Sequence, residues 1–482
     1  MSATSPVALL EDDDRLRLPA GTNLRDDHRG RLVLGRGPRR FAIGPLLPGV
    51  AAAVRSLATA AATAPDLARV AGVGDGAAAQ LEHVLGRLAD RGWLERTAFT
   101  GGSPVATLRP IGLPVAGPRP AAAAGSPVAL SRFAFVHRDG GALVVESPRS
   151  SWTVVLDDPR AAGLVAALAR PVPPAELDAV AFGLPDGAAA ALVRLLDSAG
   201  LLVAEPAGAG GSDEDRLQEM AQWSLVDLAF HTASRFGHQA GGYGGTFPLK
   251  DRFDPLTERR PLAGRPIDLT LPDLARAAAS DPPFTTVLER RRSVRAHDDA
   301  SPVTLDRLGE FLYRSAGERR RPGAGGEDEA ARPYPTGGGL YELELYPVVG
   351  RCDGLGSGLY HYDPVGHRLG LLADDGPAVR RLLDDARARS LMPDTPQVLV
   401  VVAARFGRVM YKYEAIAYAV ILKNVGALYQ TMYCVATAMG LAPCALGGGS
   451  SEAFCSAAGT DPLVESSVGE FVIGSRTPHA AP

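Results

Sequence analysis

The sequence predicts an α+β protein in which two winged-helix-like domains precede a larger C-terminal domain that contains a long buried helix. Two observations predict this arrangement. The N-terminal half carries a degenerate repeat of helix, glycine and short strand, and an apolar run with helical spacing lies near the C-terminus. The chain has 482 residues, 46% of them hydrophobic, which is enough for about two to four domains. We expect a first winged-helix-like domain at 1–112, a second at 126–206, a helical linker at 207–260 and the C-terminal domain at 261–482.

The repeat in the N-terminal half consists of an amphipathic helix, a glycine stop and a short strand. The first copy starts at Asp75 and stops at Gly92, and the second starts at Asp186 and stops at Gly200. A β-rich stretch precedes each copy. This order of elements is typical of two tandem winged-helix-like domains.

Winged helices often bind DNA, but the helices of this repeat are rich in Ala and Leu and contain few cations. The formal net charge of −4 gives no support to a polyanionic partner, so we expect no nucleic-acid binding. Two alternatives stay open. These domains capture a peptide that adds a strand to an exposed sheet edge, or they only support the C-terminal domain.

Segments rich in Pro, Gly and Ala at 113–127 and 206–211 are predicted linkers. An amphipathic helix is predicted from Ser212 to His238, followed by a turn-rich segment at 239–260. His231 in this helix is a ligand or acid/base candidate, but a helix-end histidine with satisfied bonds is the simpler interpretation.

The apolar run from Ala415 to Gly440 contains Lys423, Asn424 and Gln430, which favours a buried helix over a membrane span. We therefore expect no membrane association. The four cysteines form no Cys-x-x-Cys pair, and acidic residues stand where a signal peptide would be apolar, so we expect a cytoplasmic protein without a metal site.

Short motifs with chemical meaning follow one another in the C-terminal domain. Consecutive arginines suit an anionic group, and glycines let backbone amides approach a planar ring or a phosphate. Taken singly, each motif also fits a solvated face, a tight turn or a surface lysine beside a packing tyrosine. The motifs are Arg291-Arg292-Ser293-Val294-Arg295, Pro335-Thr336-Gly337-Gly338-Gly339-Leu340-Tyr341, Leu359-Tyr360-His361-Tyr362-Asp363-Pro364, Lys412-Tyr413 and Cys444-Ala445-Leu446-Gly447-Gly448.

In this order the motifs resemble the SagB-type peptide azoline dehydrogenases, a branch of the nitroreductase-like superfamily, over about residues 280 to 476. The resemblance implies an antiparallel central sheet, a central helix in the interface of a homodimer, and bound FMN. It also implies that Lys412 and Tyr413 are catalytic. The cofactor-binding residues that it implies are Arg291, Arg292, Ser293, Arg295, Pro335, Thr336, Gly337, Gly338, Leu446, Gly447, Gly448 and Arg476.

The activity that this resemblance implies is oxidation of thiazoline or oxazoline rings in a modified peptide to thiazole or oxazole, with molecular oxygen taking the electrons from the reduced flavin. The expected partners are a heterocyclised peptide, with or without a leader segment, and a cyclodehydratase. Two rival functions stay open at this point: an NAD(P)H-dependent flavin reductase of the same fold, and a peptide-binding scaffold without catalytic activity.

Overall fold

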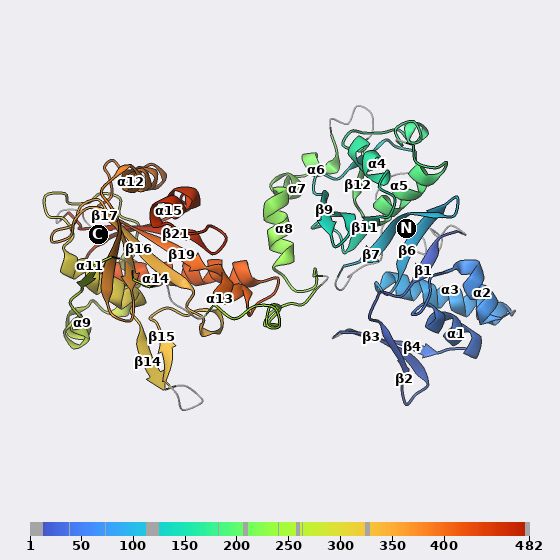
Figure 1. The fold of residues 1–482 in the computed structure, drawn as a ribbon, viewed down its shortest axis with the longest axis horizontal. Coiled ribbons are helices and arrows are strands. Elements are labelled where there is room, and N and C mark those ends of the chain that lie inside the picture. The colour runs from blue at the N-terminus through green and yellow to red at the C-terminus, as the bar shows by residue number, and fades with distance from the viewer. Residues whose placement is uncertain are drawn as a thin grey trace. The chain divides into compact units, whose positions relative to one another are not determined.

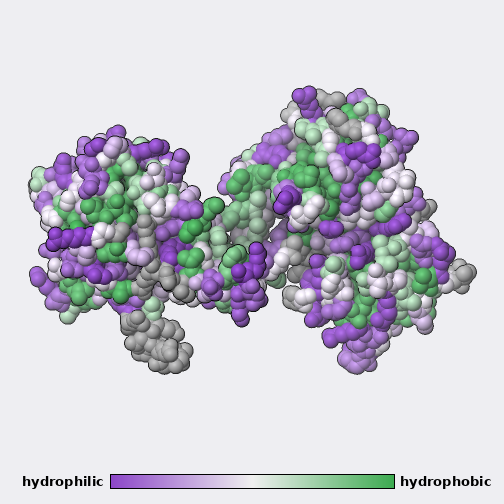
Figure 2. Space-filling model, viewed as in Figure 1, coloured by the Kyte–Doolittle hydropathy of each residue, from purple (hydrophilic) through white to green (hydrophobic). Residues whose placement is uncertain are grey.

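The computed structural model describes residues 13–477 except 38, 73, 112–124, 182, 206–210, 240, 257–260, 263 and 323–327. The chain forms two compact units, Met1–Gly242 and Tyr243–Pro482, and each is described by itself. Figure 1 shows the elements of both units, and Figure 2 shows that hydrophilic side chains cover much of the visible face of each, with apolar patches between them. The predicted linkers at 113–127 and 206–211 lie largely outside the described residues.

The N-terminal unit is built from short strands and helices that alternate in groups. In chain order these are β1 (Arg15–Arg17), β2 (Asn23–Asp26), β3 (Arg31–Arg36), β4 (Arg39–Pro45), α1 (Pro48–Ser56), β5 (Ala62–Thr63), α2 (Ala64–Ala71), α3 (Asp75–Asp90), β6 (Glu95–Thr100), β7 (Ser103–Pro110), β8 (Val128–Leu130), β9 (Phe135–Asp139), β10 (Ala142–Glu146), β11 (Trp152–Leu156), α4 (Ala161–Ala167), the 3₁₀ turn η2 (Pro174–Glu176), α5 (Ala188–Ser198), β12 (Leu202–Ala204), α6 (Asp213–Arg216), α7 (Gln218–Ala221) and α8 (Leu225–Ala233).

Two separate apolar cores lie in this unit. The first is formed by the sheet β2-β3-β4 and helices α1 to α3, and the second by β7, β11, α4 and α5. One seven-stranded sheet, β5-β1-β6-β7-β11-β10-β9, runs through both regions because β7 pairs with β11. The two predicted winged-helix-like domains therefore share a sheet, and their assignment as winged helices stays a prediction.

Where one helix was predicted from Ser212 to His238, the structure has the three short helices α6, α7 and α8. The backbone of Leu217 is extended, which ends α6. Ser224 then caps α8, since its side-chain oxygen accepts a hydrogen bond from the Asp227 N–H at 3.1 Å.

Among the described residues, the longest helix and the longest strand lie in the C-terminal unit. In chain order its elements are β13 (Pro266–Asp268), α9 (Leu274–Ser280), α10 (Phe284–Arg290), α11 (Leu305–Ala316), β14 (Arg319–Pro322), β15 (Asp328–Ala331), the 3₁₀ turn η3 (Gly337–Gly339), β16 (Leu343–Val349), β17 (Gly358–Asp363), β18 (Arg368–Asp374), α12 (Pro377–Ser390), β19 (Val398–Arg405), α13 (Phe406–Met410), α14 (Ala417–Ala438), β20 (Ala442–Leu446), α15 (Ser451–Ala458) and β21 (Glu465–Gly474).

The centre of this unit is an antiparallel sheet with the strand order β13-β18-β17-β16-β19-β21-β20. Successive side chains of β19 point to opposite faces, as strand geometry requires. Val398, Val400 and Val402 pack into the core that contains α11 and α14, while Leu399 and Val401 pack into the core that contains α12 and α15. The expected antiparallel sheet with a central helix is therefore present (Figure 1).

Helix α14 coincides with the apolar run at 415–440. It buries Ile421, Leu428 and Met432, whereas Tyr418 and Leu422 are exposed on the unit considered alone. Across the described residues, the structure contains no helix of the length and apolarity needed to cross a membrane.

Candidate active site

The glycine loop that precedes β16 is tied to helix α14 by buried polar groups. The Gly337 N–H donates to Asn424 Oδ1 at 3.1 Å, and Asn424 Nδ2 donates to Glu342 Oε1 at 2.7 Å. A Cβ at Gly337 would lie 2.5 Å from Val420 Cγ1, so the loop can approach the helix this closely only with glycine at this position. The predicted cofactor-binding segment from Pro335 to Gly338 is therefore fixed to the central helix.

Glu342 is the buried end of this chain of contacts. Burial raises the pKa of Glu342. The hydrogen bond from Asn424 and the nearby guanidinium group of Arg408 act in the opposite direction and lower it, but burial has the larger effect. The second carboxyl oxygen, Oε2, has no hydrogen-bond partner among the described residues. The environment thus shifts Glu342 toward its protonated form.

The predicted catalytic pair reaches the same loop from another element. Lys412 and Tyr413 follow α13, and both side chains end beside the backbone of Gly338. A Cβ at Gly338 would lie 2.6 Å from Tyr413 Oη and 2.7 Å from Lys412 Nζ. Gly338 also has φ +67°, a left-handed conformation that favours glycine. The fold therefore brings together Lys412, Tyr413 and the glycine loop, which are more than seventy positions apart in the sequence.

A second group of predicted residues meets around Tyr433, near the other end of α14. The Tyr433 hydroxyl lies 2.7 Å from Ser293 Oγ and accepts a hydrogen bond from the Ala445 N–H at 2.8 Å. The Arg291 guanidinium lies over the Tyr433 ring, 5.1 Å from its centroid. The Val294 N–H donates to Pro443 O at 2.8 Å, which holds the arginine motif along β20.

The glycine turn that follows β20 has an open side and a closed side. A Cβ at Gly447 or Gly448 would meet nothing within 4 Å, so the backbone of these predicted cofactor-binding residues faces open space. A Cβ at Gly449 would instead collide with the carboxyl group of Glu470. Burial raises the pKa of Glu470, which lies under the closed side of the turn.

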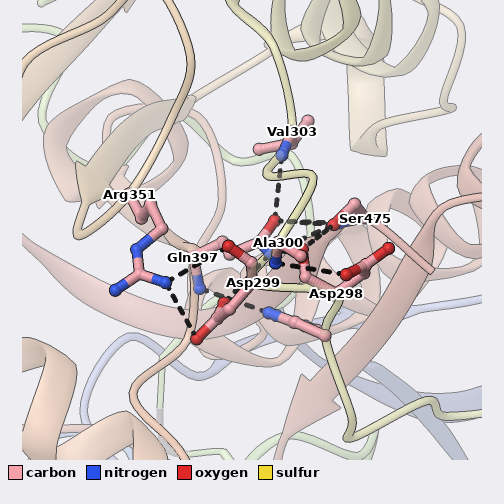
Figure 3. Close-up of polar contacts among 8 residues, drawn as sticks. Asp298, Asp299, Ala300, Val303, Arg351, Gln397 and Ser475 are labelled. Atoms are coloured by element: carbon pink, nitrogen blue, oxygen red, sulfur yellow. Dashed lines mark hydrogen bonds and ion pairs between the residues drawn. The ribbon is translucent and has the colours of Figure 1, made fainter. Parts of the chain in front are cut away.

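Gln397 anchors the chain segment that follows the arginine motif (Figure 3). This side chain is fully buried. Its Oε1 accepts hydrogen bonds from the backbone N–H groups of Val303 at 3.0 Å and Ser475 at 2.9 Å, and its Nε2 donates to Asp298 O at 3.0 Å. Gln397 thus joins the segment after the arginine motif to the residue that precedes Arg476.

The remaining predicted cations lie at the edges of this arrangement. Arg295 Nε donates to Ser390 O at 2.7 Å, at the end of α12, and Arg292 is exposed. The assignments of Arg292, Arg295 and Arg476 as cofactor contacts stay predictions.

Sequence reasoning did not assign the residues that hold the motifs in place: Asn424, Tyr433, Glu342 and Gln397. Asn424 carried a usable signal, because an amide inside an apolar helix needs a hydrogen-bond partner. Tyr433 carried none, because a tyrosine in such a helix packs well without a specific role.

Comparison with known proteins gives two family matches. Residues 288–475 match the model of the nitroreductase family, and residues 128–240 match the model of the cyanobactin oxidase ThcOx. MJ1384, a predicted nitroreductase of Methanocaldococcus jannaschii, is 27% identical over 184 residues, which cover 38% of this chain and 85% of that protein.

Two solved structures are also similar. A nitroreductase-like protein from Ralstonia eutropha JMP134 is 24% identical, with 47% of this chain and 99% of that chain covered and a TM-score of 0.35. The Escherichia coli microcin synthetase McbBCD complex with truncated pro-MccB17 bound is 18% identical in the matched chain, with 51% and 86% covered and a TM-score of 0.34.

Proposed function

We propose that this chain, which carries a nitroreductase-family domain behind a ThcOx-type segment, is an FMN-dependent dehydrogenase that oxidises azoline rings in a modified peptide. The observation that carries the proposal is the convergence of Lys412 Nζ and Tyr413 Oη on the Gly338 backbone. An acid/base pair beside a glycine loop suits removal of a proton from a ring held against a planar cofactor.

The residues present fit FMN. Arg291 and Arg292 supply cations for its phosphate, and the open backbone at Gly447 and Gly448 leaves space for a flat ring. The loop at Gly337 and Gly338 packs so closely against α14 and the catalytic pair that only glycine fits at these two positions. When bound, FMN accepts the hydride that leaves the azoline ring.

Aromatising an azoline ring removes a hydride and a proton from neighbouring ring atoms. In this proposal one member of the pair, Lys412 Nζ or Tyr413 Oη, accepts the proton. Lys412 Nζ and Tyr413 Oη lie 2.7 Å and 2.6 Å from the same point, the position of a Cβ on Gly338, so the two polar groups are close enough to act on one substrate atom. The buried Asn424 and Glu342 take no part in proton transfer here, and they position the loop against which the pair rests.

We further propose that two copies of the chain form the complete site. Asn424 and Tyr433 are nine positions apart on α14, which corresponds to about 13 Å along the axis and about half a turn around it. The two groups of site residues therefore lie on different sides of one helix. An apolar surface for a second copy is formed by exposed side chains of two adjacent helices. These are Tyr418 and Leu422 of α14 and Phe284 and Leu288 of α10.

For the N-terminal unit we propose peptide binding. In the described residues β4 and β9 are edge strands of their sheets, as are β2 and β5 at the opposite edges, so an added peptide strand has an unpaired edge to bind. The ThcOx match covers β9 but not β4. The proposed partner is a cyclodehydratase that makes the azoline rings. Deletion of the N-terminal unit should weaken peptide binding without removing FMN.

The variants Lys412→Ala and Tyr413→Phe test the chemistry. Each should keep FMN and lose azoline oxidation by at least about 10²-fold, the usual size of a general-base contribution. Arg291→Ala should fold but lose most of its FMN. Near wild-type turnover in both pair variants would reject their role, whereas unchanged FMN content in Arg291→Ala would reject only the phosphate contact.

A further inference from the structure

The segment Tyr243–Phe247, here called the strap, lies directly on the catalytic pair. It falls between the two segments that match family models, 128–240 and 288–475. The Gly244 N–H donates to Glu414 O at 3.1 Å, the Glu414 N–H donates to Gly244 O at 2.9 Å, and the Phe247 N–H donates to Lys412 O at 3.1 Å. The strap is thus bonded to the residues on both sides of Tyr413.

A side chain adds a fourth bond. The Thr246 hydroxyl donates to Glu414 Oε2 at 2.7 Å, although Thr246 is itself exposed. A hydrogen bond to a carboxylate is stronger than one between neutral groups. This bond therefore ties the strap to the short stretch Lys412–Glu414, from which the catalytic side chains project.

Tyr413 lies between two glycines. A Cβ at Gly245 would lie 3.9 Å from Tyr413 Cε1, and a Cβ at Gly338 would lie 2.6 Å from Tyr413 Oη. The backbone of the strap therefore lies beside the ring of Tyr413, and the backbone of the glycine loop lies beside its hydroxyl.

Phe247 presents an aromatic ring beside this stretch. Its side chain is 44% exposed, and its ring meets that of Tyr411 edge to face with 6.4 Å between centroids. Its φ of +53° is rare for a bulky residue, and such strain persists where the surroundings impose it and concentrates at functional sites. Here the backbone N–H of Phe247 bonds to Lys412 O at 3.1 Å.

We propose that the strap positions Lys412 and Tyr413 for catalysis, and that Phe247 and Tyr411 bind the ring-bearing part of the peptide substrate. A flat five-membered heterocycle packs well against the edge or face of an aromatic side chain. This inference rests on the proposed function, and the substrate-binding role is measured with a peptide that does not react.

The positioning role is tested with Thr246→Val and Thr246→Ser. Thr246→Val keeps the shape of the side chain and removes the donor, so kcat should fall about tenfold while KM and FMN content stay unchanged. Thr246→Ser restores the hydroxyl and should stay within about twofold of wild type. Full kcat in Thr246→Val, or an equal loss in Thr246→Ser, would overturn the positioning role.

The binding role is tested with a synthetic peptide that carries one thiazole, the oxidised ring that cannot turn over. Phe247→Ala should weaken its binding by at least about tenfold. Phe253→Ala is the matched control, because Phe253 lies outside the strap, is 58% exposed and has its ring beside the Arg252 guanidinium. No binding by the wild type, or equal binding by the wild type and Phe247→Ala, would overturn this role. Binding by a wild-type protein that fails to oxidise a thiazoline peptide would reject the proposed reaction alone.

Discussion

Replacing Gly338 with alanine should separate catalysis from stability. The new methyl group would lie 2.6 Å from Tyr413 Oη and 2.7 Å from Lys412 Nζ, against an ordinary contact of about 3.4 Å or more. The two side-chain ends must therefore retreat by roughly 0.7 Å. Such a shift costs little energy for flexible side chains, but it moves the two atoms that carry the proposed chemistry.

Gly339 supplies the control. Both glycines have φ +67°, so alanine at either site pays the same backbone cost of about 1–2 kcal/mol, but a Cβ at Gly339 would meet nothing within 4 Å. Gly338→Ala and Gly339→Ala should thus lose similar free energies of unfolding. Only Gly338→Ala should also lose turnover, by about 10²-fold, because misplacement of this size can cost that much.

The assay combines three measurements on both variants: FMN content, denaturant unfolding, and the rate of azoline oxidation followed by mass spectrometry. Equal turnover in the two variants, with equal stability, would refute the assignment of Lys412 and Tyr413 to the site at Gly338.

The residues that hold the motifs give further predictions. Tyr433→Phe removes the hydroxyl that joins Ser293 to β20. The free energy of unfolding should fall by about 1–2 kcal/mol, measured by denaturant titration, and FMN content should fall, measured by flavin absorbance. Gln397→Leu should lower the free energy of unfolding by about 2–4 kcal/mol, because it leaves buried backbone N–H groups without an acceptor. Unchanged stability would contradict the anchoring role. The raised pKa of Glu342 means that the folded state binds its proton more tightly than the unfolded state. Its contribution to stability is present below the ordinary carboxyl pKa and is lost as the pH rises above it, toward the raised pKa of the folded state. Glu342→Gln should therefore reduce this decline in stability with rising pH. An unchanged pH profile in denaturant titrations of this variant would show that Glu342 is ionised in the folded protein.

Local patterns predicted the central helix of the C-terminal unit well. The apolar run at 415–440 became α14 at Ala417–Ala438. This helix follows from periodicity and stop signals, which act over a few residues. The predicted helix from Ser212 to His238 was wrong in extent, because an extended residue and a serine cap divide it into three.

Contacts between distant segments could not be predicted in the same way. Asn424 bonds Glu342 across 82 positions, and Tyr433 bonds Ser293 across 140. No spacing rule links such residues, because tertiary packing brings them together. The strap was missed for the same reason, since a turn-rich sequence does not show which buried or catalytic group it will cover.

Mass spectrometry of one reaction shows directly whether this protein oxidises azoline rings with FMN. Purified protein with its bound flavin is incubated in air with a peptide that carries a single thiazoline. We expect a product that has lost two hydrogens, with Lys412→Ala yielding at least about 10²-fold less in the same time. A wild-type protein that binds FMN yet leaves the peptide mass unchanged would contradict azoline oxidation.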